Sequence, residues 1–484
     1  MTSASIYAFE LPTTGSFSFA DWFSDASNTH TSQIAEATQV RANLRSVLKE
    51  SKRTDGEKDH LRVVKVLDDY IPHLYGVIAC VGSGDIVQLR EPVFSWRTTL
   101  SSHLFTSSPR LSLPSLPVEL TFTLLTYAFA LSNLARSSVS ALQSYERERG
   151  ISDVERKAKD EKLGFAVTLL SKAGGVFAFV AETVLVEAEK DRGATWLDGI
   201  ERPPELSRPV IHALSKLCLA QAQSLAIRKL LSKSAFDSTV TPGPPLPKSH
   251  PSPSLIAKLH LESASLLSSS LSLSRIPGAS KFRLKSPKHM FSSKSNGDGS
   301  AGQTKDEMVV SEDLTKFLAD VVAMHTAMAH KWLGVDAGEN HIDTKGGEAV
   351  GYLTWAKKEL EDLKDGGTKG GGKEEGKDGK KERKEGVVGE LESVALFLRH
   401  YKKLNDSLSY LPVPSQAALQ SSTPTGRLAV AIKPYTKPTP SFGPGSVEYV
   451  RQQAEELELI GTEDGDSLAA STPERPYAGA GSYF

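Results

Sequence analysis

We predict an all-α fold for this chain of 484 residues, built as an elongated, solenoid-like array of helices. Three observations support the prediction. Most of the long apolar stretches repeat their apolar residues at steps of three and four, which is the spacing of one helix face. Segments rich in Pro, Gly and Ser interrupt these stretches and set the ends of the helices. The helices follow one another in pairs without a strict sequence repeat, as expected of a solenoid.

The stretch Leu214–Leu230, LSKLCLAQAQSLAIRKL, predicts an inner helix of the array. Its apolar residues lie on more than one side, which is typical of a helix that is surrounded by others. Four alanines keep parts of its surface thin, so that neighbouring backbones can approach; they are Ala213, Ala220, Ala222 and Ala226. Gln221 and Gln223 lie among the apolar residues and must either face solvent or find hydrogen-bond partners.

Taken in order, the chain begins with two short aromatic segments, Ile6–Phe9 and Phe17–Phe23, with a strand-like alternation around Gly15. A connection rich in Pro and Ser follows Glu91–Leu100. Pro72 marks a kink or break within a helix, and Pro117 begins one. The expected helices span residues 33–50, 61–81, 117–134, 165–184, 214–230, 255–271, 314–332, 346–360 and 391–404.

Three insertions and a tail interrupt or follow the helical array. We expect flexible segments near residues 235–253, 276–305 and 366–385, because they are rich in Pro, Ser, Gly or Lys and have little periodicity. The array itself should occupy residues 1–420. Residues 421–484 should be mostly disordered, apart from a short helix at Val447–Leu459.

Composition limits the function classes. The formal net charge is −1, which argues against general nucleic-acid binding. The two cysteines, Cys80 and Cys218, lie in apolar helical stretches and make no disulfide framework, so we expect inert core thiols. The N-terminus lacks the basic start of a secretory signal, and the uncharged run Leu120–Ala135 is too short to span a bilayer. We therefore expect a soluble, reduced, intracellular protein.

Five segments carry a family resemblance. They are LAQAQ (Leu219–Gln223), SLIAKL (Ser254–Leu259), SKAGGVFAFVAE (Ser171–Glu182), GGEAVGYLTWAKKEL (Gly346–Leu360) and LNDSLSYLPVPS (Leu404–Ser415). In their order along the chain they resemble the Bro-one domain family of Alix and its fungal relatives, over roughly residues 1–420. The resemblance implies a curved solenoid with TPR-like helix pairs and a small N-terminal β element.

The resemblance also implies an adaptor that binds the C-terminal amphipathic helix of the ESCRT-III filament subunit of the Snf-seven type. The groove positions of the family match Ala226, Leu255 and Leu259. Ala226 stands where some members carry a bulky aromatic residue, so Ile227 and Leu230 are expected to compensate or the pocket to be wider.

Two further strings, SWRTTLSS and the ending ERPYAGAGSYF, are similar to a short branch of the family that acts in fungal ambient-pH signalling. The implied role is a scaffold without protease activity. It links an alkaline-pH sensor at the plasma membrane, with its arrestin-like complex, to ESCRT-III, so that the PacC transcription factor is activated by proteolysis. The implied location is the cytoplasm, with recruitment to plasma-membrane or endosomal foci. An adaptor for multivesicular-body cargo sorting is the alternative, and a hydrolase is a remote one.

No catalytic, cofactor or metal site is predicted. His325 and His330 are five residues apart on one helix and make a poor metal pair, with His325 partly buried or at a groove edge. The hydrolase-like block Gly465–Leu468 lies in an acidic tail, where chance explains it better. A basic segment could contact an anionic membrane or be a solvated insertion, which its lack of a helical face favours; its cations are Lys281, Arg283, Lys285, Lys288 and Lys294.

Overall fold

The computed structural model describes residues 6–54, 56–101, 109–148, 150–193, 196–197, 202–238, 243–276, 310–366 and 377–463. The chain forms two units. Unit 1 comprises Met1–Phe17, Val40–Ile71 and Glu91–Thr436, and unit 2 comprises Ser18–Gln39, Pro72–Arg90 and Lys437–Phe484. The division passes through the first two helices, α1 (Thr31–Arg53) and α2 (His60–Ser83).

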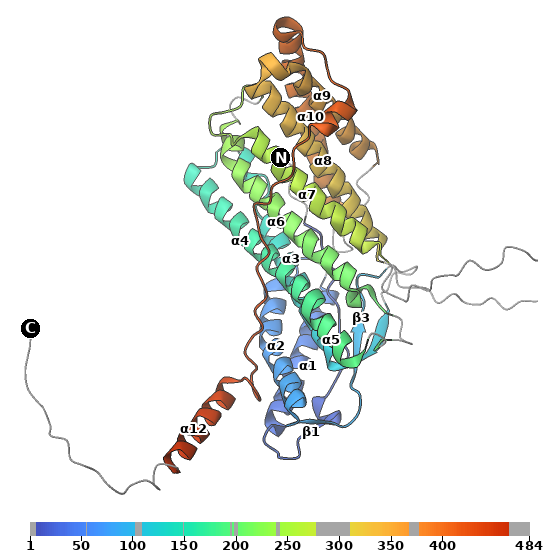
Figure 1. The fold of residues 1–484 in the computed structure, drawn as a ribbon, viewed down its shortest axis with the longest axis vertical. Helices are drawn as coiled ribbons and strands as arrows, with labels where there is room; N and C mark the ends of the chain where they lie inside the picture. Colours follow the sequence, from blue (N-terminus) through green and yellow to red (C-terminus); the bar gives the residue numbers. More distant parts are fainter. Residues whose placement is uncertain are drawn as a thin grey trace, which may run out of the picture. The chain divides into compact units, whose positions relative to one another are not determined.

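Unit 1 is the predicted helical array (Figure 1). Its further helices are α3 (Leu116–Ser140), α4 (Asp153–Phe179), α5 (Leu185–Arg192), α6 (Arg208–Asp237), α7 (Pro253–Ser274), α8 (Glu312–Asn340), α9 (Ile342–Gly366), α10 (Lys377–Leu404) and α11 (Gln416–Ser421). From α3 to α10, apart from the short α5, each long helix packs against the next one along the chain. This nearest-neighbour packing is that of a solenoid, so the predicted fold class is confirmed.

Proline and serine mark most of the helix starts. Pro117 lies in the first turn of α3 as predicted, and Ser152 and Ser311 cap α4 and α8 through their hydroxyl oxygens. Residues 243–252 of the Pro-rich connection between α6 and α7 form neither helix nor strand, as predicted. Pro72, however, lies inside the continuous helix α2.

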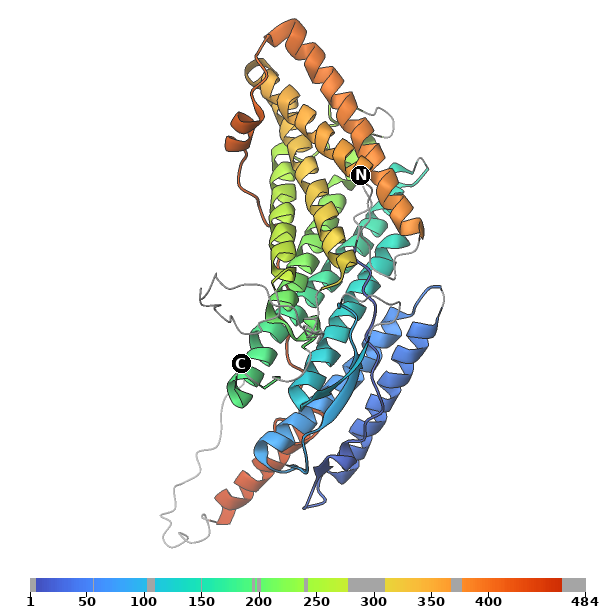
Figure 2. The same ribbon diagram turned by 90° about the vertical axis from the view of Figure 1, so that its right-hand side faces the viewer.

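The helix α10 corrects one prediction. It begins at Lys377, so residues 377–385, which we expected in a flexible spacer, are helical. Their Lys and Glu residues are good helix formers, and Lys381 pairs with Glu385 one turn later at 3.8 Å. Figure 2 shows α10 in orange alongside the other late helices of unit 1, and it packs on α9 and α8.

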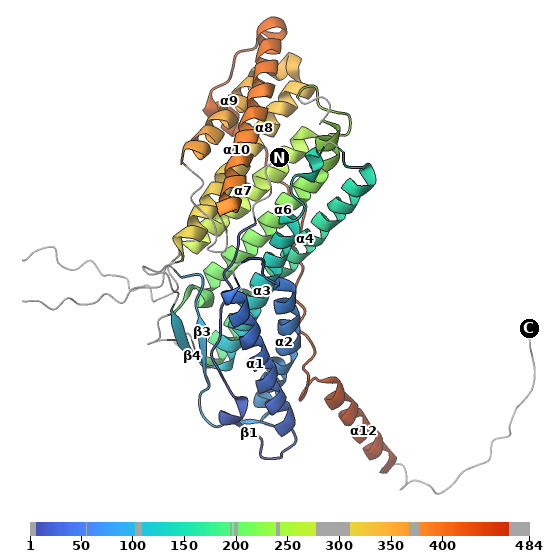
Figure 3. The same cartoon turned by 180° about the vertical axis from the view of Figure 1, so that it is seen from behind.

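The small N-terminal β element is confirmed: near Gly15, where we expected it, Thr14 forms an isolated antiparallel bridge to Trp96, but the two strands of unit 1 lie at residues that we did not predict. The strands β3 (Val93–Arg97) and β4 (Arg110–Pro114) are antiparallel, with Trp96 opposite Leu111 (Figure 3). Ile6–Phe9, where we expected β structure, is extended but belongs to no strand. The reason is that the Asn133 side chain forms hydrogen bonds with both backbone groups of Phe9. The Phe9 nitrogen donates to Asn133 Oδ1 at 2.9 Å, and Asn133 Nδ2 donates to the Phe9 oxygen at 2.7 Å.

Buried carboxylates hold the SWRTTL segment of unit 1. Glu119 accepts hydrogen bonds from Trp96 Nε1 at 2.6 Å and from Tyr70 Oη at 2.8 Å. Arg41 Nε donates to the same carboxylate at 2.8 Å. Glu205 accepts the backbone nitrogens of residues 99 and 100, and burial raises the pKa of its carboxyl. These groups tie α1, α2, α3 and β3 together.

Unit 2 contains a second small sheet and the last helix. Its strands are β1 (Phe23–Ser24) and β2 (Val87–Gln88), and α12 (Val447–Glu463) confirms the expected helix there. Gly84, with a φ of 85°, follows the end of α2, where a glycine in this conformation stops a helix. The segment between Lys437 and α12 packs on α2, since Phe442 covers Gly76. The expectation of a mostly disordered tail is therefore wrong for this stretch.

Three helical segments of the described residues are long and apolar enough to cross a membrane, by length and composition alone. They are Leu116–Ser140, Asp153–Arg192 and Arg208–Asp237. The first contains the uncharged run Leu120–Ala135, which by itself we judged too short to span a bilayer. The most apolar windows are 89%, 61% and 72% buried, respectively. Packing against neighbouring helices therefore accounts for their hydropathy.

Candidate partner-binding face

The register between α6 and α7 places the residues singled out by the sequence. Ser270 Oγ donates to the Ala213 carbonyl at 2.7 Å, and Gln223 Nε2 donates to the Leu259 carbonyl at 2.8 Å. As residue numbers rise along α6, from 213 to 223, the residues that they contact on α7 fall from 270 to 259. The two helices therefore run antiparallel. Continued in the same register, Leu255 falls opposite residues 227–228 of α6, within one helical turn of Leu230.

Two of the five predicted groove residues are core residues. Ile227 and Leu259 are each only 3% exposed and belong to the apolar core shared by α6, α7, α8 and α9. We therefore correct the expected groove, because a ligand on the surface cannot reach them. Helical spacing selects a side of the helix, but it does not show which of two neighbouring apolar positions faces inward.

The other three residues form an apolar surface, which we call the α6–α7 face: Ala226, Leu230 and Leu255. Leu230 is 42% exposed, and Ala226 and Leu255 are half-buried. Leu255 also packs against the core with its inner side. The small side chain of Ala226 leaves room beside Leu230. Such a surface can receive apolar side chains from a partner helix.

An extended segment of the chain itself, residues 423–436, crosses the same side of α7, α6 and α4 (Figure 1). We call it the strap. The Arg427 nitrogen donates to the Lys258 carbonyl at 2.9 Å, and the Ala429 nitrogen donates to Gln223 Oε1 at 3.0 Å. The strap therefore lies about one helical turn from Leu255 and Ala226, and its Leu428 side chain is 46% exposed.

The strap ends on α4, where two glycines receive it. The Lys433 nitrogen donates to the Ser171 carbonyl at 3.0 Å. A Cβ atom at Gly175 would lie 1.8 Å from the Lys433 oxygen, so a side chain there excludes the strap. A Cβ atom at Gly174 would lie 3.1 Å from the Cγ2 methyl group of Ile432. The glycine pair in SKAGGVFAFVAE was the sequence signal for this contact, and we did not recognise it.

The two glutamines of the LAQAQ segment differ in their surroundings. Gln223 is fully buried, and both ends of its amide are hydrogen-bonded to α7 or to the strap. It thereby holds α6, α7 and the strap in one register. The buried Gln221 amide makes no hydrogen bond within the part of the chain that the structure describes.

The two histidines of α8 face different partners, as their spacing predicted. His325 Nδ1 lies 2.9 Å from His260 Nδ1, and His330 Nδ1 lies 2.8 Å from Glu359. His325 is 6% exposed, so it is a core residue and not one at a groove edge. Burial lowers the pKa of His325 to about 4, and burial together with the neighbouring His325 lowers that of His260 well below its usual value. Both imidazoles are held in the neutral form.

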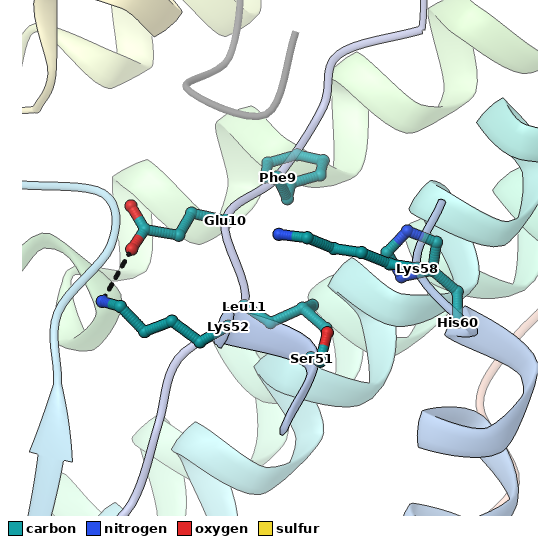
Figure 4. Close-up of a pocket in the computed structure, with 7 residues that line it drawn as sticks. All are labelled: Phe9, Glu10, Leu11, Ser51, Lys52, Lys58 and His60. Carbon is teal, nitrogen blue, oxygen red and sulfur yellow. Dashed lines mark hydrogen bonds and ion pairs between the residues drawn. The ribbon is translucent and has the colours of Figure 1, made fainter. Parts of the chain in front are cut away.

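A small pocket in unit 1 is the place to examine the hydrolase alternative (Figure 4). Its lining residues are Phe9, Glu10, Leu11, Ser51, Lys52, Lys58 and His60. Glu10 and Lys52 form an ion pair at 3.3 Å. Burial lowers the pKa of His60 to about 4, so this imidazole is a weak base. With Glu10 and Lys52 paired to each other and His60 a weak base, the pocket lends the hydrolase alternative no support.

Two predicted features lie outside the described residues. They are the basic segment with Lys281, Arg283, Lys285, Lys288 and Lys294, and the block Gly465–Leu468. Membrane contact by the basic segment stays a prediction.

Known proteins with related sequences support the family resemblance. The family model of the BRO1-like domain matches residues 20–453. The chain is 34% identical to the pH-response regulator protein palC of Cryptococcus neoformans over 99% of both chains. It is 24% identical to the palC protein of Yarrowia lipolytica over 99% of both chains. For the palC protein of Emericella nidulans the identity is 26%, over 96% of this chain and 95% of the relative.

Solved structures show the same fold at lower identity. An ALIX structure in complex with a SIVmac239 late domain has a TM-score of 0.57 and 17% identity, and it covers 90% of this chain. The chain spans 50% of that ALIX chain. A structure that explains endosomal targeting by the Bro1 domain has a TM-score of 0.53 and 14% identity, over 90% of this chain and 94% of that chain. Family model, relatives and fold agree, and the chain belongs to the BRO1-like domain family, among the pH-response regulators of the palC type.

Proposed function

We propose that this chain is an adaptor of ambient-pH signalling that binds the C-terminal amphipathic helix of the Snf-seven type ESCRT-III subunit on the α6–α7 face. The observation that carries the proposal is the surface formed by Ala226, Leu230 and Leu255. It is apolar and accessible, and it lies on the helices whose motifs resemble the partner-binding helices of the family. The names of the palC relatives supply the pathway.

The adaptor links alkaline-pH sensing at the plasma membrane to ESCRT-III, and so to proteolytic activation of PacC. The chemistry of the face suits this role, because an amphipathic helix buries apolar side chains there without any covalent step. Each fully buried Leu-sized side chain contributes about 1.5–3 kcal/mol. Two or three such contacts give the moderate affinity that a reversible adaptor requires.

A binding titration tests the proposal directly. The full chain is titrated with a labelled peptide of the filament subunit's C-terminal helix, and the anisotropy is measured. Leu230→Asp and Leu255→Asp should each weaken binding at least tenfold, because a charge is left unpaired beneath the ligand. Leu61→Asp is the matched control, since Leu61 is 47% exposed on α2.

The readout must separate loss of binding from loss of folding. The melting temperatures of the Leu230→Asp and Leu61→Asp proteins should stay close to that of the parent chain, because both side chains are substantially exposed. Undiminished peptide affinity in the folded Leu230→Asp and Leu255→Asp proteins would move the binding site elsewhere.

Cargo sorting at endosomes is the second candidate, because one solved structure of the fold concerns endosomal targeting by the Bro1 domain. Cells carrying Leu230→Asp distinguish the two roles. Loss of PacC processing at alkaline pH with normal sorting of ubiquitylated cargo supports the pH adaptor. The reverse pattern supports the sorting adaptor.

A further inference from the structure

Three potential metal ligands meet in unit 2, away from the α6–α7 face in the sequence. They are a ring nitrogen of His30, Cys80 Sγ and a carboxylate oxygen of Asp85, and all three atoms lie within 4.8 Å of one another. Cys80 and Asp85 lie five residues apart at the end of α2, whereas His30 comes from a distant part of the sequence. The fold therefore brings His30 to a pair of residues that is local in the sequence.

Local structure fixes each of these side chains. Cys80 lies in the last turns of α2, and the positive φ of Gly84 turns the chain so that Asp85 follows beside it. His30 immediately precedes α1. Its backbone nitrogen donates to Asp25 Oδ2 at 2.5 Å, and Asp25 also accepts from Ser27 Oγ at 2.6 Å. A hydrogen-bonded turn thus holds the imidazole in place before α1 begins.

The C-terminal segment of unit 2 covers the cluster. The backbone of Gly443 approaches Cys80 so closely that a Cβ atom would lie 2.1 Å from its sulfur. The Phe442 ring lies 5.7 Å from the His30 ring, centroid to centroid. Cys80 is fully buried as a result, whereas Asp85 is exposed and leaves the cluster open on one side. A small ion can enter from that side, while the thiol is shielded from larger oxidants.

A further observation points to a ligand at this cluster. His30 Nδ1 is buried and has no hydrogen-bond partner within the described residues. A divalent cation between these groups would coordinate the orphaned nitrogen and offset the repulsion between thiolate and carboxylates.

We propose that His30, Cys80 and Asp85 bind one Zn²⁺ ion. Zinc bonds of about 2.0–2.3 Å place tetrahedral ligands about 3.3–3.7 Å apart, so the three atoms need to close by little more than 1 Å. A thiolate and an imidazole select zinc over Mg²⁺ or Ca²⁺, which take oxygen ligands. Binding forms the Zn–S bond and releases the Cys80 proton to solvent. The fourth position is left for water.

The ion would join the start of α1 to the end of α2 and would hold the covering segment around Phe442 and Gly443. Zinc binding would therefore stabilise unit 2 by linkage, because the unfolded chain does not bring the three ligands together. The proposal does not depend on the α6–α7 face, and it stands or falls separately from the proposed function.

The test uses the untagged full chain, held reduced with a phosphine that binds metal weakly. Isothermal titration should give one Zn²⁺ site, and titration with Co²⁺ should give the thiolate-to-cobalt absorption band in the near ultraviolet. The band should vanish in Cys80→Ala and persist in Cys218→Ala. Cys218 is a matched control, because it is the second buried free cysteine and lies in α6.

A second variant is needed to show that His30 is a ligand and that loss of zinc binding is not caused by unfolding. His30 is only partly buried, so His30→Ala should stay folded and should weaken Zn²⁺ binding at least tenfold while raising no new band. Zinc should raise the melting temperature of the parent chain and of Cys218→Ala, but not that of Cys80→Ala. No Zn²⁺ uptake, or a cobalt band that survives in Cys80→Ala, would overturn the proposal.

Discussion

The buried cluster around Glu119 and the α6–α7 face lie in the same unit, but they treat polar and apolar groups in opposite ways. At Glu119 a fully buried carboxylate receives hydrogen bonds from Arg41, Tyr70 and Trp96. On the α6–α7 face, apolar side chains such as Leu230 remain in contact with solvent. In the first region both oxygens of the buried carboxylate accept hydrogen bonds from protein groups, whereas in the second apolar side chains remain exposed to solvent.

This difference separates what holds the fold from what is available to a partner. Removing one member of a buried, hydrogen-bonded charge cluster leaves the other charge uncompensated, which is costly. Removing an exposed leucine changes little in the free protein. Substitutions in the two regions should therefore fall into separate classes, one altering stability and the other altering binding.

The largest effect is expected at Glu119. Glu119→Gln keeps the shape of the side chain but leaves the buried Arg41 guanidinium without its anion. We expect a loss of about 3–5 kcal/mol in the free energy of unfolding, measured by urea denaturation. Glu50→Gln is the control, since Glu50 and Arg62 form an exposed pair that should contribute less than about 1 kcal/mol. Equal effects at the two sites would contradict the comparison.

Acid should weaken the core at the pair of His260 and His325. The pKa of His325 is lowered to about 4 in the folded chain, from 6.5, so folding favours the neutral imidazole. The stabilisation is complete above pH 6.5 and is lost as the pH falls from 6.5 towards 4, by up to about 3 kcal/mol. His325→Gln should flatten this part of the profile of unfolding free energy against pH. An unchanged slope between pH 7 and pH 4.5 would assign the acid sensitivity to other groups, such as His60.

The helices of unit 1 could be predicted from the sequence because their signals are local. Apolar spacing identified α6 and α8, and Pro117 marked the start of α3. The strands β3 and β4 were missed because they are short and because β4 reads as a Ser- and Pro-rich connection. The start of α10 was missed because its Lys, Glu and Gly residues resemble a spacer.

Which of the expected groove residues are accessible could be predicted only in part, because it depends on contacts between residues far apart in the sequence. Spacing along one helix suffices to bring Ala226 and Leu230 to one side, but whether Ile227 faces inward depends on the helices packed around it. The strap pairs residues some two hundred positions apart, such as Gln223 and Ala429. His30 and Cys80 likewise meet only through the fold. No periodic pattern records such contacts.

A substitution beneath the strap should have a destabilising effect of intermediate size. Gly175→Ala places a methyl group against the Lys433 carbonyl, so the strap must leave α4 and lose the hydrogen bond to Ser171. We expect a loss of about 1–2 kcal/mol in the free energy of unfolding and faster tryptic cleavage after Arg427. Gly164→Ala is the control on the same helix, because its methyl group meets only the flexible end of Lys229. Equal cleavage rates in both variants would show that the strap is not held at Gly175.

The smallest effect should come from Leu428, which tests whether the strap is part of the partner-binding face. The backbones on either side of it are tied to Lys258 and Gln223, so its 46% exposed side chain stands beside the face. A partner helix that reaches the strap would bury the rest of this side chain, at about 1 kcal/mol. Leu428→Ser should then weaken the peptide roughly fivefold without altering the melting temperature. Because Leu428 is absent from the motifs that suggested the face, a measurable loss would extend the binding surface from α6 and α7 onto the strap. Unchanged affinity would confine it to Ala226, Leu230 and Leu255.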